Sequence, residues 1–419
     1  MVSDTDRAFL TAMFDAAIAA ADPAKILIDV LPPRPKGRTI VIGAGKGVAH
    51  LAAAFEEVWD APIEGVVVTR KGFAVPCRAI RVLEASHPVP DAAGIDASAA
   101  LREAVADLGP DDLVVALITG GGSALLPAPP LGFALADEQV LNRALLTSGA
   151  PISAMNAIRK CFSSIKGGRL AALAHPARVV TLVVSDVPGD AAYAVASGPT
   201  IADPSGATEA LAALAAWRID LPDRIVAHLG KSRPPSPADP VFDGHEVRVI
   251  ASARQSLEAA ARIAERAGVQ AVILSDRIEG EAREVAKMHG AIAQEIREHA
   301  RPFKAPVVLL SGGETTVTLR GDGKGGRNSE FLLSLALTCE GLGGFAALAA
   351  DTDGIDGSEN NAGAFADGQS CARLRALGMD PAGMLANNDA WSAFRSLGDL
   401  FSPGPTGTNV NDFRAIVLR

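Results

Sequence analysis

Short apolar runs that end in glycine-rich turns recur along this chain, and they constrain its fold more than any other feature. The runs 38–42, 112–118 and 307–310 pass into the turns GAGKG, TGGGS and SGG. Apolar runs of this length, bounded by glycine, are typical of buried strands, and helical segments follow most of them. Strands and helices that alternate in this way indicate an α/β fold.

Length and charge limit the number of domains and the classes of partner. A chain of 419 residues is too long for one core of ordinary size, so we expect two domains. The proline-rich polar run 230–240 is the most convincing linker, and it places the boundary between residues 237 and 238. A net charge of −9 argues against nucleic acid or an anionic membrane surface as the main partner, but not against small anionic ligands.

The cysteines and the N-terminal segment favour a cytoplasmic protein. Cys77, Cys161, Cys339 and Cys371 are scattered without CxxC spacing, so we expect reduced thiols rather than disulfides or a zinc site. The first 21 residues have early acidic positions and predict an amphipathic helix, not a signal peptide. No run of about 18 uninterrupted apolar residues occurs, so we expect no membrane span.

A lysine stands within the first glycine turn. Strand, turn and helix in this order form a phosphate-binding loop at the end of a parallel strand. We expect the backbone to approach the phosphate at Gly43, Gly45 and Gly47. Lys46 favours a site for a transferring phosphate, because hydride-transfer folds need small neutral residues against the pyrophosphate. The alternative is a plain strand–helix connection with a solvated lysine.

The segments after the second and third strands leave two hypotheses open. The second strand, 65–68, is followed by Arg70 and Lys71 where an NAD-binding unit would place an acidic residue, so an NADP site remains a weaker hypothesis. In the loop after the third strand, His87 could bind a ligand or serve as a local hydrogen-bonding residue.

The second turn follows a fully apolar strand and predicts a second backbone-lined anion site. Ligands of open α/β sheets collect at such strand ends. The residues that we expect to line it are Gly120, Gly121, Gly122 and Ser123.

Two further candidates lie between this turn and the linker. Asn156 and Lys160 are one turn apart on the helical region expected over 153–173, so they share a face. The strand at 179–184 ends in SDVPGD, where two carboxylates four residues apart form a good hard-cation site. Asp190, held by the Pro188-Gly189 turn, is the preferred metal-associated or catalytic carboxylate.

The stretch 311–330 predicts a third anion site. The strand at 307–310 is expected to break at Ser311-Gly312-Gly313 before Glu314, and residues 315–319 to form a second strand. The loop GDGKGG, which includes Gly325 and Gly326, then opens a helix that Asn328 or Ser329 can cap. Lys324 and Arg327 beside this helix start would complete the site.

Acidic residues follow the apolar strand at 345–350. Asp351, Asp353 and Asp356 resemble the opening of a calcium loop, but Glu359 comes too early to be its last ligand. We therefore interpret them as a carboxylate-rich turn, with Asp351 and Asp353 as candidate metal ligands.

Taken in order, these motifs resemble the glycerate 2-kinase family, whose C-terminal part is known as the MOFRL domain. The matching blocks run over nearly the whole chain: GAGKG, LITGGGSAL, MNAIRKCFSSIKGGRLA, SDVPGD with SGPT, SGGETT, GKGGRNSE, AADTDGIDG and PTGTNVND. The resemblance implies an N-terminal Rossmann-like parallel sheet, a C-terminal mixed α/β domain and an active site in the cleft between them.

The resemblance also implies an activity. Family members are ATP- and magnesium-dependent kinases that convert D-glycerate to 2-phosphoglycerate, with a lysine and an arginine in the active site that map onto Lys46 and Arg327. Phosphoryl transfer needs positioning and charge neutralisation, and the glycine turns, these cations and the acids Asp190 and 351–356 can supply both. Any of the three glycine turns could take ATP and another glycerate; none of them has the GxxxxGK[ST] pattern.

Two other hypotheses stay open. Family members are also labelled hydroxypyruvate reductase, so an NADP-dependent reductase is the alternative activity. A non-enzymatic anion-binding module is the third hypothesis, and tight ligand binding without turnover would identify it. The expected partners are small molecules, with a homo-oligomer left open.

Overall fold

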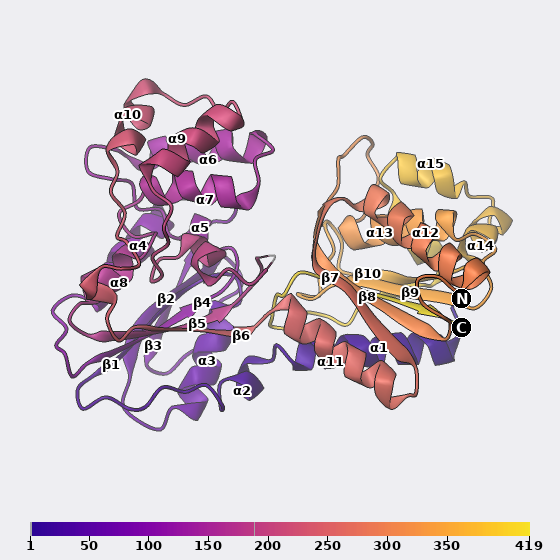
Figure 1. The fold of residues 1–419 in the computed structure, drawn as a ribbon, viewed down its shortest axis with the longest axis horizontal. Helices are drawn as coiled ribbons and strands as arrows, with labels where there is room; N and C mark the ends of the chain where they lie inside the picture. Colours follow the sequence, from indigo (N-terminus) through magenta and orange to yellow (C-terminus); the bar gives the residue numbers. More distant parts are fainter. Residues whose placement is uncertain (1, 188) are drawn as a thin grey trace. The chain divides into compact units, whose positions relative to one another are not determined.

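The computed structural model describes residues 2–187 and 189–419, which divide into two compact units. Unit A comprises Pro23–Ile250, and unit B comprises Met1–Asp22 with Ala251–Arg419. Each unit contains one six-stranded sheet with helices packed on it (Figure 1). The α/β class predicted from the sequence is confirmed.

This division differs from the boundary predicted at residues 237 and 238. Helix α1 (Asp4–Ala19) belongs to unit B, where Phe14 packs edge-on against Phe401 with ring centroids 5.0 Å apart. At the other end, β6 (Glu246–Ala251) adds the last strand to the sheet of unit A. The proline-rich run therefore lies within unit A, because the strand that follows it completes that unit's sheet.

The sheet of unit A has the strand order β3-β2-β1-β4-β5-β6. Its first five strands are β1 (Thr39–Ala44), β2 (Glu64–Arg70), β3 (Ile80–Ala85), β4 (Leu113–Ile118) and β5 (Arg178–Val184). Pairings among these five strands are parallel. This is the order of a Rossmann-like sheet, in which the connection reverses direction between β1 and β4.

Helices cover both faces of this sheet and form a separate cluster beside it. They are α2 (Pro23–Ile26), α3 (Val48–Val58), α4 (Ala92–Ala104), α5 (Gly122–Leu125), α6 (Leu135–Thr147), α7 (Ile152–Cys161), α8 (Arg169–Ala174), α9 (Ala207–Ala216) and α10 (Asp223–Lys231), with 3-10 turns η1 (Ala192–Ser197) and η2 (Pro240–Phe242). Helices α4 and α8 share a core with alternate residues of β1 and β4. The helices α6, α7, α9 and α10 pack on one another through their own core (Figure 1).

The helical region predicted over 153–173 is interrupted, as the sequence Lys166-Gly167-Gly168-Arg169 within it indicates. The region 153–173 forms α7 and α8, separated by residues 162–168. Gly167 and Gly168 take φ values of +64° and +82°, a left-handed conformation that ends helical geometry and that glycine adopts without steric cost.

The sheet of unit B is mixed, with the order β11-β10-β9-β12-β8-β7. Its strands are β7 (Gln270–Glu281), β8 (Val307–Thr316), β9 (Phe345–Asp351), β10 (Gly363–Asp367), β11 (Leu400–Phe401) and β12 (Asp412–Leu418). Only the β7–β8 pairing is parallel among the pairings described for this sheet. The last strand of the chain therefore lies in the middle of the sheet, between β9 and β8.

Two helical layers enclose this sheet. Helices α1 and α11 (Ala253–Arg266) cover one face, while the other face packs against α12 (Ala282–His299), α13 (Arg327–Thr338), α14 (Ser370–Ala376), α15 (Pro381–Ala386) and α16 (Ala390–Leu397) (Figure 1). Alternate residues of β12 divide between the two cores: Ala415 and Val417 face α1, and Ile416 and Leu418 face α13. This alternation is what a strand buried on both faces requires.

The expected break at Ser311-Gly312-Gly313 does not occur. Strand β8 continues to Thr316, and Gly313 pairs with Asp412 of β12 and Ile278 of β7. A Cβ on Gly313, whose φ is +118°, would lie 2.2 Å from the carbonyl oxygen of Ile278. Gly313 therefore allows β7 and β8 to approach each other closely where β7 is irregular, and it does not form a turn.

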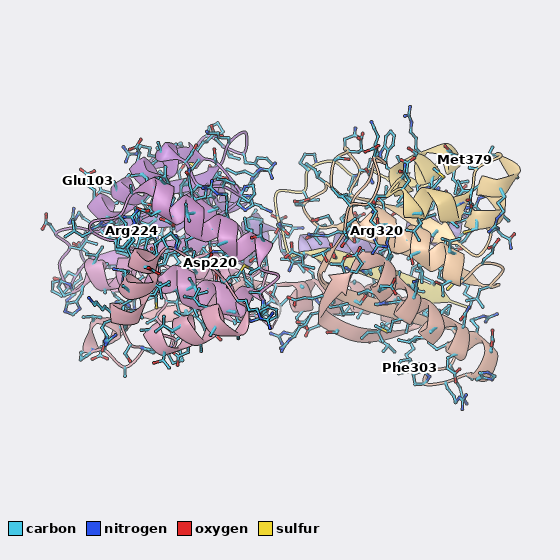
Figure 2. All side chains as sticks on the ribbon, turned by 90° about the horizontal axis from the view of Figure 1, so that it is seen from above. Glu103, Asp220, Arg224, Phe303, Arg320 and Met379 are labelled. Carbon is cyan, nitrogen blue, oxygen red and sulfur yellow. The ribbon has the colours of Figure 1, made fainter. Side chains whose placement is uncertain are left out.

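Charged side chains occupy the outer surface of both units. Glu103 and Arg224 of unit A and Arg320 of unit B are exposed (Figure 2). Among the described residues, no helix combines the length and apolarity needed to cross a bilayer.

Candidate functional site

The loops after β1 and β4 lie against each other at the carboxyl edge of the unit A sheet. The Lys46 N–H donates to the Gly120 carbonyl at 2.8 Å, and the Gly47 N–H donates to Thr119 Oγ1 at 3.2 Å. A Cβ on Gly45 would lie 2.1 Å from the same Thr119 oxygen, so only glycine allows this approach. Ligands of open α/β sheets bind at this point, where the strand order reverses. The two predicted glycine turns therefore form parts of one site.

Gly43 contributes to this edge from within β1, and not from the turn. A Cβ on Gly43 would lie 2.5 Å from the Leu117 carbonyl oxygen of β4 and 2.8 Å from Val48 of α3. Its role is to bring α3 close to the sheet, which sets where the turn after β1 ends.

Two side chains converge above Gly121, which has a φ of +81°. A Cβ at this position would lie 2.9 Å from Lys46 Cγ and 3.3 Å from His87 Nε2. The missing side chain of Gly121 thus leaves the space in which Lys46 and His87 approach each other. The sequence alone leaves the role of His87 open, because the position of this residue depends on how β3 lies relative to β4.

An acidic side chain lies over the neighbouring glycine. A Cβ on Gly120 would lie 1.8 Å from Asp186 Oδ2, which places that carboxylate at the site. Asp190, the residue preferred from the sequence, has a left-handed backbone with φ of +57° and donates its N–H to the Val187 carbonyl at 3.1 Å. Pro188, predicted to hold it, lies outside the described residues. Of the two carboxylates in the SDVPGD motif, the structure thus places Asp186 against the second glycine turn.

A chain of hydrogen bonds connects Asn156 to the second glycine turn. The Ser197 hydroxyl donates to Asn156 Oδ1 at 2.9 Å and lies 2.7 Å from the Ser123 hydroxyl, while Asn156 Nδ2 donates to the Ala194 carbonyl at 2.9 Å. Ala196 and Ser197 both have left-handed φ values, +52° and +59°. Such backbone costs about 1–2 kcal/mol per non-glycine residue, and it concentrates at functional sites.

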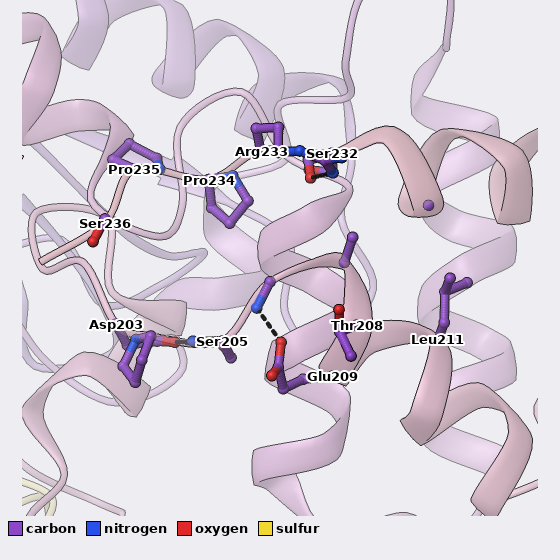
Figure 3. A pocket seen from close by; sticks show the side chains of 14 residues that line it. Asp203, Ser205, Thr208, Glu209, Leu211, Ser232, Arg233, Pro234, Pro235 and Ser236 are labelled. Atoms are coloured by element: carbon purple, nitrogen blue, oxygen red, sulfur yellow. Dashed lines mark hydrogen bonds between the residues drawn. The ribbon is translucent and has the colours of Figure 1, made fainter.

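Lys160 points elsewhere. Its ammonium is buried in an ion pair with Asp203 and lies 5.0 Å from the centre of the Tyr193 ring. Burial lowers the pKa of Lys160 to about 8, and the neighbouring Cys161 opposes that shift. Asp203 also lines a pocket of about 400 Å³ beside the start of α9, where Glu209 accepts a hydrogen bond from Gly206 (Figure 3). The structure therefore brings Asn156, and not Lys160, into the hydrogen-bond chain at the second glycine turn.

In unit B, Arg327 binds three carboxylates from three strands or strand ends. Its Nε donates to Asp412 at 2.6 Å, and its terminal nitrogens donate to Glu314 and Asp351, both at 2.8 Å. Burial lowers the pKa of the guanidinium, but the three carboxylates outweigh burial and raise it overall. The predicted candidates Glu314, Arg327 and Asp351 are therefore brought together.

The carboxylates proposed as metal ligands in unit B already bind other groups of the protein. One Asp351 oxygen binds Arg327, and the other accepts the Asp353 N–H at 3.1 Å, while Asp353 accepts the Ile355 N–H at 2.9 Å. Burial raises the pKa of Asp351, with Arg327 opposing it and Asp353 adding to it. Within the described part of the chain, no three His, Cys, Asp or Glu side chains form a metal-binding group. Mg²⁺ commonly uses one or two carboxylates with substrate phosphates, which is the arrangement these residues still fit.

The start of α13 already holds an anion from the protein. Asp356 accepts the N–H groups of Asn328 and Ser329 at 2.9 and 2.8 Å, and a Cβ on Gly326 would lie 2.4 Å from its Oδ1. The cap expected from Asn328 or Ser329 is thus wrong: Asp356 caps the helix, and Asn328 instead donates to Asp412 at 2.9 Å. Burial raises the pKa of Asp356, and the Ser329 hydroxyl opposes this.

The loop GDGKGG is also satisfied internally, contrary to the prediction of an open anion cradle. N–H groups of residues 320–324 donate to oxygens of Asn387, Asn388 and Asp389. The Lys324 ammonium lies 3.2 Å from Glu359. Gly325, with φ of +146°, packs near Trp391. The contacts of Asn387 and Asn388 span more than sixty residues, so no local pattern could reveal them.

The chain is similar to known proteins over most of its length. Residues 9–230 match a family described as "Domain of unknown function (DUF4147)", and residues 307–412 match the MOFRL family. The chain is 50% identical to a protein of Agrobacterium vitis provisionally named hydroxypyruvate reductase, covering 98% of this chain and 94% of that one. It is 38% identical to D-glycerate 2-kinase of Thermotoga maritima, covering 94% of each chain.

A solved structure extends this similarity to the fold. The crystal structure of a glycerate kinase from Thermotoga maritima matches with a TM-score of 0.90 and 36% identity, covering 100% of both chains.

Proposed function

Because the chain belongs to the glycerate 2-kinase family and carries its C-terminal MOFRL domain, we propose that it transfers the γ-phosphoryl group of ATP to the 2-hydroxyl of D-glycerate. The observation that supports this most is the position of Lys46 above Gly121, where the loops after β1 and β4 meet. A cation at a glycine-lined strand end suits phosphoryl transfer, which depends on positioning and charge neutralisation.

We propose Lys46 and Arg327 as the two catalytic cations of the kinase. Lys46 provides one charge in unit A, on backbone fixed by its bond to Gly120. Arg327 provides the other in unit B, with its guanidinium oriented by Glu314, Asp351 and Asp412. A planar group with several donors can bind a phosphate while keeping some of these partners.

Mg²⁺ is the proposed metal, and when bound it neutralises charge on the nucleotide phosphates. Asp190 is the residue of unit A proposed to hold it. Asp351 and Asp353 remain weaker candidates, because their oxygens already accept hydrogen bonds from the protein. One or two carboxylates suffice when phosphates complete the coordination.

NADPH-dependent reduction of hydroxypyruvate is the second candidate, because the relative from Agrobacterium vitis bears that name. Arg70 and Lys71, the residues that could bind the 2′-phosphate of NADPH, are engaged in other contacts. Lys71 donates to Asp91 at 2.7 Å and to Ser86 at 3.0 Å, and the Arg70 guanidinium lies 4.0 Å from the centre of the Phe73 ring. These contacts favour the kinase.

Parallel turnover assays on the purified protein test the proposal. One assay follows ADP release with D-glycerate, ATP and Mg²⁺, with L-glycerate as the control substrate. The other follows NADPH and NADH oxidation with hydroxypyruvate. We expect ADP release that depends on D-glycerate and Mg²⁺, and no hydride transfer above background. Hydride transfer that disappears when Arg70 and Lys71 are both changed to Ala would favour the reductase.

A further inference from the structure

His87 lies at the proposed kinase site without an assigned role. Its Nε2 is 3.3 Å from the point where a side chain on Gly121 would begin, and Lys46 Cγ is 2.9 Å from that same point. The imidazole is partly exposed, and no hydrogen bond joins its ring nitrogens to another described residue. A ring nitrogen therefore lies beside the second glycine turn and has no hydrogen-bond partner among the described residues.

The loop that carries His87 is braced by a carboxylate. Asp91 accepts the N–H of Ser86 at 3.2 Å, the Ser86 hydroxyl at 2.7 Å, the Lys71 ammonium at 2.7 Å and the Gly94 N–H at 3.1 Å. These bonds fix the residue before His87 to the start of α4. The imidazole is thus presented by a held loop, as positioned catalytic groups require.

The surroundings keep the imidazole neutral. Burial lowers the pKa of His87, and together with the nearby charges of Lys46 and Arg70 it brings the pKa to about 4. At neutral pH one ring nitrogen is therefore a hydrogen-bond acceptor. This acceptor nitrogen, beside the cation of Lys46, can accept a hydrogen bond from a substrate hydroxyl.

We propose that Nε2 of His87 accepts the proton of the substrate hydroxyl that is phosphorylated beside Lys46; this rests on the proposed function. As the hydroxyl oxygen forms its bond to the γ-phosphorus, its proton passes to Nε2. The bond from the γ-phosphorus to the bridging oxygen breaks, and its electron pair leaves with ADP. The imidazolium then releases the proton to solvent.

The test compares His87→Ala and His87→Asn with wild type and with His175→Ala. His175 is the matched control, because it is an exposed histidine of the same unit that also precedes a proline. Both His87 variants should lose about 100-fold or more in kcat, the scale of a positioned general base. The KM for ATP should stay within about twofold, because the lost interaction forms only in the transition state. Added imidazole should restore part of the activity of His87→Ala.

The outcomes separate the proposal from the activity on which it rests. If wild type makes no phosphoglycerate, both are overturned before any variant is compared. If wild type is active and folded His87→Asn keeps more than about a third of its kcat, the proton acceptor is another group, with Asp186 the next candidate. Failure of imidazole to restore folded His87→Ala also overturns the proposal. If His87→Ala does not fold, His87→Asn and His87→Gln decide through kcat.

Discussion

Replacing Arg327 by Ala should destabilise unit B, and the loss should shrink as the pH falls. The substitution removes the cation from three carboxylates, which differ in the hydrogen-bond and ion-pair partners that they keep. Asp412 still binds Arg414 and the Thr315 N–H, and Glu314 is half-exposed, so both lose little. Asp351 is buried and loses its cation. Its uncompensated charge should therefore account for most of the effect.

The size and the pH dependence follow from the burial of Asp351. Removing one partner of a buried ion pair costs about 3–5 kcal/mol. The folded-state pKa of Asp351 is already raised by burial, and without Arg327 it rises further. A carboxylate with a raised folded pKa destabilises the fold at high pH, and its protonation removes that cost as the pH falls through the raised pKa. The difference from wild type should thus be largest near pH 8 and smaller near pH 5.

Hydrogen exchange in the central strand β12 measures this difference within unit B. Arg375→Ala is the control, because Arg375 pairs with Glu340 on the surface, and such pairs contribute at most about 1 kcal/mol. Arg327→Lys should recover only part of the stability, since one ammonium cannot reach three carboxylates.

Two results would refute this reasoning. One is an Arg327→Ala loss no larger than that of Arg375→Ala. The other is a loss of the same size at pH 5 and pH 8, which would assign the effect to packing and not to the carboxylate charge.

Four further predictions test other parts of the account. Lys46→Ala should lower kcat about 100-fold in the ADP-release assay, the scale of one lost charge stabiliser, without changing the melting temperature. Asp190→Asn should raise the Mg²⁺ concentration needed for turnover or abolish turnover in a Mg²⁺ titration; a lower melting temperature with unchanged activity per folded molecule would make Asp190 a turn residue. Gly313→Ala should lower the melting temperature more than Gly341→Ala, because both have positive φ but only Gly313 meets the backbone of β7. The pKa of His289 is lowered to about 4 by burial, so its contribution to stability is complete above pH 6.5 and falls by about 2 kcal/mol at pH 5; His289→Gln should flatten this loss in denaturant titrations.

Much of the fold could be predicted because buried strands can be recognised from their amino-acid sequence. The strands β1, β4 and β9 are almost wholly apolar, and a glycine or aspartate lies at the carboxyl end of each or within two residues of it. By contrast, Gly312 and Gly313 resemble a turn, and only their pairing with β7 and β12 keeps them in strand β8. Likewise, an amphipathic helix at the N-terminus does not indicate which sheet it covers.

The site could be predicted only as far as local patterns and strand ends allow. The meeting of the turns at Lys46 and Gly120 follows from the rule that parallel strands end at one edge. The capping of α13 by Asp356 and the gathering of Asp412 and Asp351 on Arg327 join residues 24 to 85 positions apart. Such contacts depend on sheet order, which no single segment encodes.

The central claim is that this protein phosphorylates the 2-hydroxyl of D-glycerate, and proton-coupled phosphorus NMR of the reaction mixture tests it directly. The phosphorus of 2-phosphoglycerate couples to the single hydrogen on C2 and gives a doublet, whereas 3-phosphoglycerate couples to the two hydrogens on C3 and gives a triplet. We predict a doublet that grows as the ATP signals decline and that is absent without Mg²⁺. A triplet would contradict the assigned hydroxyl, and the absence of any new phosphate ester would contradict the kinase itself.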